Sequence, residues 1–157
     1  KPPFMSEGDA LRLTTKWVSE VAPHSQDISV NPMNIQRRTV VDRLYRNREY
    51  RPPWLWSLVD MLENTHADTA GAGVRMIVHP TAGGKLRGAH NCGKCDEDVV
   101  AAIERYSVSA DLRELEGLTC DCKAVWKAEI CNDLSLPVPL GTGSDRRGSL
   151  TDLLRAP

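Results

Sequence analysis

The chain of 157 residues has few aromatic residues, and most of it contains no cysteine. With one Phe, three Tyr and four Trp, its core must consist mainly of Leu, Val, Ile and Ala. All five cysteines fall within residues 92–131, and an odd number cannot pair completely within one chain. No signal-peptide-like segment opens the sequence. We therefore expect reduced or metal-bound thiols in an intracellular protein of the cytoplasm or nucleus.

Net charge and long apolar runs are lacking as well. The 20 Lys and Arg residues balance the 21 Asp and Glu residues, so no overall charge favours nucleic acid or an acidic partner. No apolar run approaches the roughly 20 residues that span a membrane, and we expect no membrane contact. The first residue is Lys1, not Met, so we interpret the sequence as a fragment or a processed product.

Familiar catalytic motifs are also missing. The four histidines are scattered, and none of them belongs to a pattern that resembles a catalytic triad or the His-Glu-x-x-His motif of zinc proteases. The segment Thr81-Ala-Gly-Gly-Lys85 is basic and rich in glycine, but it lacks the spacing of a phosphate-binding P-loop. These absences predict a protein that is not an enzyme.

The sequence does contain a concentrated set of metal ligands. A Cys-x-x-Cys pair at 92–95 and a Cys-x-Cys pair at 120–122 are separated by 24 residues, enough for a helix. Four soft ligands that can converge on one ion are typical of a structural zinc site. The predicted zinc ligands are Cys92, Cys95, Cys120 and Cys122, and Cys131 or His90 could replace one of the second pair.

Two other interpretations of the cysteines remain open. They could be free, partly buried thiols, or Cys92 and Cys95 could form a redox pair of thioredoxin type. Asp96 and Asp98 argue against the redox pair, because neighbouring carboxylates disfavour the thiolate that it needs. A thiol-dependent enzyme is a further alternative if Cys131 is not a ligand.

Apolar periodicity predicts a mainly α fold, α+β at the margin, with one strand at 74–79 and a short one at 28–30. Asn31-Pro32 has the pattern of a helix start, because Asn caps and Pro suits the first turn. We expect residues 1–66 to form a helical bundle of about three helices and 74–134 a zinc-binding α/β module. Residues 135–157 have the composition of a flexible tail.

A second feature is an arginine-rich segment. Residues 35–51 contain six Arg against two acidic residues, and Tyr45, Tyr50, Trp54 and Trp56 are interleaved or adjacent. Guanidinium groups bind phosphates and aromatic rings stack on bases, so this segment is the best candidate for contact with RNA. The alternative to RNA contact is that the arginines form a solvated helix face and that Trp54 and Trp56 pack on the helical bundle. The predicted nucleic-acid-binding residues are Arg37, Arg38, Arg43, Arg46 and Arg48.

Together these features predict a zinc-stabilised regulatory or adaptor protein that acts through protein–protein contacts. An RNA-binding protein is the first alternative, and a small viral regulatory protein would fit the atypical cysteine spacing. The sequence identifies neither the protein partner nor the oligomeric state.

Overall fold

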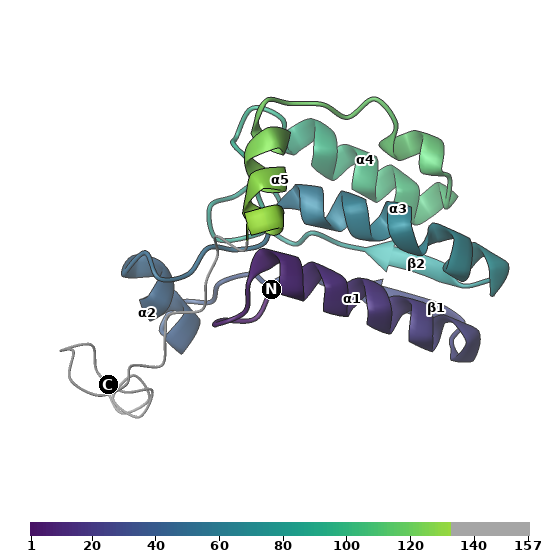
Figure 1. Ribbon diagram of the computed structural model, residues 1–157, viewed down its shortest axis with the longest axis horizontal. Coiled ribbons are helices and arrows are strands. Elements are labelled where there is room, and N and C mark those ends of the chain that lie inside the picture. The colour runs from purple at the N-terminus through teal and green to yellow at the C-terminus, as the bar shows by residue number, and fades with distance from the viewer. Residues whose placement is uncertain (133–157) are drawn as a thin grey trace.

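The computed structural model describes residues 1–132, and the structural statements that follow concern these residues. Five α-helices and two short strands make up the fold (Figure 1). The helices are α1 (Glu7–Val21), α2 (Val40–Arg46), α3 (Leu55–Gly71), α4 (Asp96–Ser109) and α5 (Cys122–Asn132), with 3-10 turns η1 (Ala22–His24) and η2 (Leu112–Leu115). The strands are β1 (Asp27–Val30) and β2 (Arg75–Val78). The prediction of a mainly α fold is confirmed.

The two strands form a parallel pair in which Ile28 lies opposite Met76 and Val30 opposite Val78. Parallel neighbours need a long crossover connection, which here contains α2 and α3. The last residue of β2 is also held by α4, because the Ser107 hydroxyl accepts from the backbone N–H of Val78 and donates to its carbonyl.

The start of the second helix was predicted wrongly. Residues 31–36 are not helical, and α2 begins at Val40 after Thr39, whose side chain accepts a hydrogen bond from the backbone N–H of Asp42. Thr39 is thus the N-cap that Asn31 was expected to be. The segment that precedes α2 instead packs against the connection between β2 and α4, where the Ile35 N–H donates to the Arg87 carbonyl at 2.8 Å.

The main hydrophobic core is centred on α3, which lies between α1 and α4 (Figure 1). It contains residues from α1, α3, β2, α4 and α5, for example Val18, Leu62, Val78, Ile103 and Trp126. Both predicted units, residues 1–66 and 74–134, therefore contribute to one core. The division into these units stays a prediction, and the predicted tail at 135–157 lies outside the described residues.

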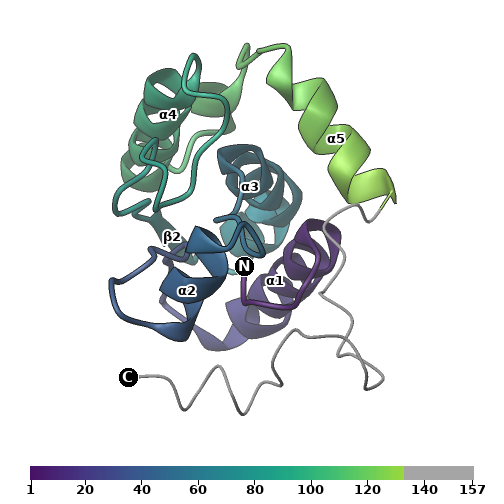
Figure 2. The same ribbon diagram turned by 90° about the vertical axis from the view of Figure 1, so that its left-hand side faces the viewer.

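A smaller hydrophobic cluster lies beneath α2. It consists of Ile35, Leu44 and Tyr50, with partly buried neighbours that include Tyr45. This cluster gives α2 its own support beside the main core, at the end of the molecule seen in Figure 2. Among the described residues, no helix combines the length and apolar content that crossing a membrane requires.

Candidate metal centre

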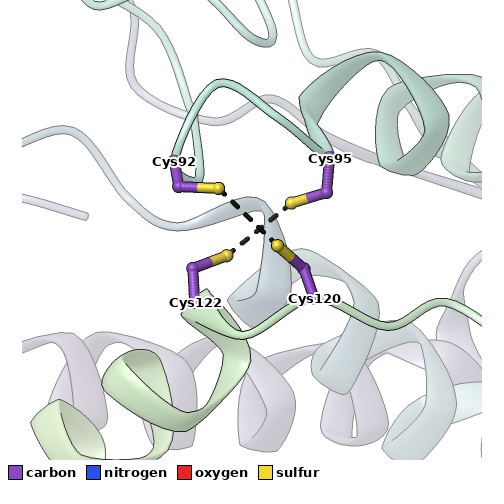
Figure 3. A group of neighbouring side chains, drawn as sticks. All are labelled: Cys92, Cys95, Cys120 and Cys122. Carbon is purple, nitrogen blue, oxygen red and sulfur yellow. Dashed lines mark hydrogen bonds between the residues drawn. The ribbon is translucent and has the colours of Figure 1, made fainter.

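Four cysteine sulfurs converge at one point between the start of α4 and the start of α5 (Figure 3). The Sγ atoms of Cys92, Cys95, Cys120 and Cys122 all lie within 4.8 Å of one another. The Cys92–Cys120 and Cys95–Cys122 sulfurs are each 3.7 Å apart. Tetrahedral zinc with Zn–S bonds of about 2.3 Å requires S···S distances of about 3.8 Å. The spacing thus suits a single tetrahedral ion, whereas an iron–sulfur cluster distributes four thiolates over two or four irons and would hold some of them further apart.

The first pair of cysteines lies in a turn that leads into α4. Asp96, the first residue of α4, accepts hydrogen bonds from the backbone N–H groups of Asn91 at 2.8 Å and Gly93 at 2.6 Å. Gly93 has a φ of 90°, which a residue without Cβ adopts easily. Asp96 therefore shapes the turn that presents Cys92 and Cys95. From the sequence it was expected only to disfavour a thiolate at these cysteines.

The second pair is placed by the first turn of α5. The backbone N–H of Lys123 donates to the Cys120 carbonyl at 2.9 Å, so the chain turns tightly between the two thiols. Cys122 is the first residue of the helix. A one-residue spacing can therefore direct both sulfurs to the same point.

The site has a buried half and an exposed half. Cys95 and Cys122 are 7% and 8% exposed, while Cys92 is exposed. Each buried sulfur receives a side-chain hydrogen bond, from Asn91 Nδ2 to Cys95 Sγ at 3.4 Å and from Trp56 Nε1 to Cys122 Sγ at 3.2 Å. Such N–H donors offset the negative charge that four thiolates around a divalent ion leave in the protein.

The thiols also differ in acidity, because two of them are buried and Cys92 is exposed. Burial raises the pKa of Cys95 to about 12, and it also raises the pKa of Cys122. The backbone N–H of Lys94 lowers the pKa of Cys92 to about 7. Because a coordinating thiol is deprotonated, binding of a metal ion here would release protons from the buried pair.

Neither predicted substitute ligand joins the four sulfurs. Cys131 is an exposed thiol near the end of α5, and the Nδ1 atom of His90 lies 2.9 Å from the Gly88 carbonyl. The group that could hold a metal ion contains Cys92, Cys95, Cys120 and Cys122 and no other described residue.

The segment that supports the centre from behind was not expected from the sequence. Trp56 donates to Cys122, and its backbone N–H donates to Asn91 Oδ1 at 3.2 Å. The Arg51 guanidinium lies 3.8 Å from the centroid of the Trp54 ring and donates to the His90 carbonyl at 2.8 Å. Residues 51–56 therefore fasten the start of α3 to the cysteine turn.

The same segment is tied to α5. Trp54 Nε1 donates to Glu129 at 2.8 Å, and Trp126 Nε1 donates to the Ser57 hydroxyl at 2.9 Å. Trp54 and Trp56 are only 7% and 1% exposed, so they do not stack on bases, and the packing alternative is correct for them. The two tryptophans of the Pro-Pro-Trp-Leu-Trp run at 52–56 were the available signal, since large aromatic side chains dominate the energetics of protein cores.

The five arginines predicted to bind nucleic acid all lie on α2 or directly beside it. Four of them are exposed, namely Arg37, Arg38, Arg46 and Arg48, and Arg43 is partly buried. Arg46 also forms an ion pair of 3.0 Å with Asp42. The structure thus brings these five arginines together around the short helix α2.

Comparison with known proteins gives archaeal relatives. Archaeosine synthase subunit beta of Methanosarcina acetivorans is 34% identical over 127 residues, 81% of this chain and 36% of that protein. The protein of the same name from Thermococcus kodakarensis is 34% identical over 135 residues, 85% of this chain and 41% of that protein. An uncharacterised protein of Methanocaldococcus jannaschii is 30% identical over 146 residues, 90% of this chain and 39% of that protein.

The chain therefore spans about two-fifths of the length of the curated relatives it matches. No family model matches the sequence, and no solved structure is similar to it.

These relatives correct the predicted function. Two of them carry the name of a synthase subunit, which contradicts the prediction of a regulatory or adaptor protein that is not an enzyme. All three are archaeal, which contradicts a viral regulatory protein. The absence of catalytic motifs misled the prediction because a chain that matches two-fifths of a larger enzyme need not contain its reacting groups.

Proposed function

We propose that this chain is a zinc-binding part of a tRNA-modifying enzyme of the archaeosine synthase subunit beta type. It binds one Zn²⁺ through Cys92, Cys95, Cys120 and Cys122. The convergence of these four sulfurs at tetrahedral spacing carries the proposal. The enzyme class is supported by the named relatives, since archaeosine is a modified nucleoside of archaeal tRNA.

The zinc ion has a structural role in this proposal. Four protein ligands fill a tetrahedral coordination shell and leave no position for water or substrate, which is the pattern of structural sites. The ligands come from the turn before α4 and from the start of α5, so the ion joins two cysteine pairs that lie 24 residues apart in the sequence. The chemistry on the nucleoside then belongs to residues elsewhere in the enzyme.

A protein partner and an intracellular location are part of the same proposal. The word "subunit" in the relatives' name supports an assembly with a second protein. Modification of tRNA takes place inside the cell, which supports the predicted intracellular location.

The proposal is tested by metal content and by tRNA composition. Native mass spectrometry should find one zinc per chain, lost in acid and lost in Cys95→Ser and Cys122→Ser variants. Cys131→Ser is the matched control and should retain the ion, because this thiol lies outside the group of four. A wild-type chain without zinc, or a Cys131→Ser chain that loses it, contradicts the zinc site.

The enzyme class has its own readout. In the organism that encodes the chain, the Cys95→Ser replacement should lower the archaeosine content of total tRNA, measured by mass spectrometry of nucleosides, and Cys131→Ser should not. Unchanged archaeosine in the Cys95→Ser strain would exclude a role in this modification.

A further inference from the structure

The positive charge of the chain is concentrated in two segments that the fold brings together. Residues 35–51 and 80–94 contain nine of the 20 Lys and Arg residues and only two of the 21 Asp and Glu residues. Arg87 joins them, because its backbone carbonyl accepts from the Ile35 N–H at 2.8 Å and its side-chain Nε donates to the Ile35 carbonyl at 3.1 Å. We call these two segments the basic face. Figure 2 looks onto this end of the molecule, with α2 next to the connection between β2 and α4.

One of the two acidic residues in the basic face is neutralised inside it. Asp42 is 4% exposed and accepts hydrogen bonds from the Arg38 backbone N–H at 2.9 Å, from Arg87 at 2.7 Å and from Arg46 at 3.0 Å. Its charge is therefore directed inward and balanced by arginines. Glu49 is the one exposed carboxylate of the two segments.

The surrounding cations are exposed to solvent. The exposed members of the basic face are Arg37, Arg38, Arg46, Arg48, Lys85 and Lys94. Arg38 and Arg48 flank α2 and have φ values of 64° and 62°, a left-handed conformation that is uncommon for residues with a side chain. Backbone strain of this kind persists only where the surroundings impose it, and it often marks functional surfaces.

The basic face is also held in shape before any ligand binds. The cluster of Ile35, Leu44 and Tyr50 supports α2 from below. The Arg87 guanidinium lies 5.5 Å from the centroid of the Tyr45 ring and clamps the second segment to the helix. A surface whose backbone is already ordered loses little backbone freedom on binding, which favours affinity.

We infer that the basic face binds the phosphate backbone of tRNA, an inference that rests on the function proposed above. Guanidinium groups match phosphate oxygens in a fork geometry, and clustered Lys and Arg release counterions from RNA on binding. Tyr50, Trp54 and Trp56 are buried, so base stacking contributes little here. Contacts to phosphates position RNA without reading its sequence, and the basic face is therefore a docking surface that holds tRNA for the rest of the enzyme.

The test compares two triple variants that remove the same charge. The face variant is Arg37→Gln, Arg48→Gln and Lys85→Gln, three exposed residues that form no ion pair in the described structure. The control variant is Arg12→Gln, Lys16→Gln and Arg105→Gln, on α1 and α4. Affinity for a tRNA transcript is measured by fluorescence anisotropy between 50 and 300 mM KCl, after zinc content and melting temperature have been shown to match the wild type.

We expect the face variant to bind tRNA on the order of tenfold more weakly, with the slope of log K against log salt reduced by about three. The control variant should stay within about twofold of the wild type. Equal losses in both variants, or none in the face variant, overturn the inference. So does wild-type affinity for polyglutamate, or for phosphatidylglycerol vesicles, equal to that for tRNA. These results concern tRNA binding alone. The zinc content and the archaeosine content of tRNA test the proposed function independently.

Discussion

Asp42 is the residue on which the basic face is assembled. The hydrogen bond from Arg87 lowers the pKa of its carboxyl group, and the Arg38 backbone N–H and the charge of Arg46 act in the same direction. A carboxyl group whose pKa is lower in the folded than in the unfolded chain stabilises the fold above its unfolded pKa, about 3.9. That contribution is lost as the pH falls through the lower pKa of the folded state.

This behaviour predicts how an Asp42→Asn variant responds to pH. At pH 7 the variant should unfold at lower urea concentration than the wild type, because Arg46 and Arg87 lose their anionic partner. The difference in midpoint should shrink as the pH falls below about 4, because Asp42 of the unfolded wild-type chain then takes up a proton, and it should vanish once the pH lies below the lowered pKa of the folded state. Urea titrations at pH 7, 5 and 3 measure it, and a difference that is constant over this range contradicts the assignment. Asp68→Asn, at an exposed position on α3, is the matched control.

At the scale of elements, the start of α3 and the start of α5 meet through one hydrogen bond at the metal centre. Trp56 is 1% exposed, and its Nε1–H reaches Cys122 Sγ while the Lys123 ammonium lies 4.9 Å from its ring centroid. Groups that hydrogen-bond a metal ligand commonly change metal affinity by about 10- to 100-fold when they are removed. This geometry makes Trp56 the residue that couples the core helix α3 to the group of four sulfurs.

We therefore predict that Trp56→Phe, which keeps an aromatic ring but loses the N–H donor, weakens zinc binding by about tenfold. Competition with a chromogenic chelator gives the affinity, and the charge-transfer band of the cobalt-substituted protein reports directly on the thiolates. Trp17→Phe is the control, because Trp17 is 58% exposed on α1. If Trp56→Phe and wild type hold zinc equally and share one cobalt spectrum, the hydrogen bond does not tune the site.

Local patterns in the sequence were sufficient for elements whose signals lie within a few residues. The strands expected at 74–79 and 28–30 lie at Arg75–Val78 and Asp27–Val30. The start of α2 was misplaced because Asn31-Pro32 and Thr39 are both acceptable caps, and contacts of Ile35 with Arg87 decide between them. Such contacts join residues far apart in the sequence, so no local pattern contains them.

At the metal centre too, local signals could be read from the sequence and long-range contacts could not. The spacing of the cysteines was enough to name the four sulfurs that the fold brings together, although it left Cys131 and His90 open as replacements for one of the second pair. The donors Trp56 and Asn91 could not be selected in this way. Trp56 lies 66 positions from Cys122, and nothing in its neighbourhood marks it as a partner of a thiol.

For the molecule as a whole, the decisive feature is that one hydrophobic core joins the metal centre to the N-terminal helices. Val18 of α1, Leu62 of α3 and Trp126 of α5 belong to the same cluster, which also includes Cys95 and Cys122. Removal of the ion should therefore weaken the whole core rather than only the part around the cysteines. A ligand that binds only the folded state adds stability in proportion to the logarithm of its concentration over its dissociation constant.

We predict that a strong chelator at pH 7 lowers the melting temperature by about 10 °C or more, while unfolding remains a single cooperative transition. Calorimetry combined with circular dichroism checks this, and the Cys122→Ser variant, which lacks a ligand, should melt at the lower temperature with or without chelator. Cys131→Ser should behave as the wild type. Indifference of the wild type to the chelator would contradict a structural ion. Two separate transitions would instead show that residues 1–66 fold independently of residues 74–134, because only a core that both parts share couples their unfolding.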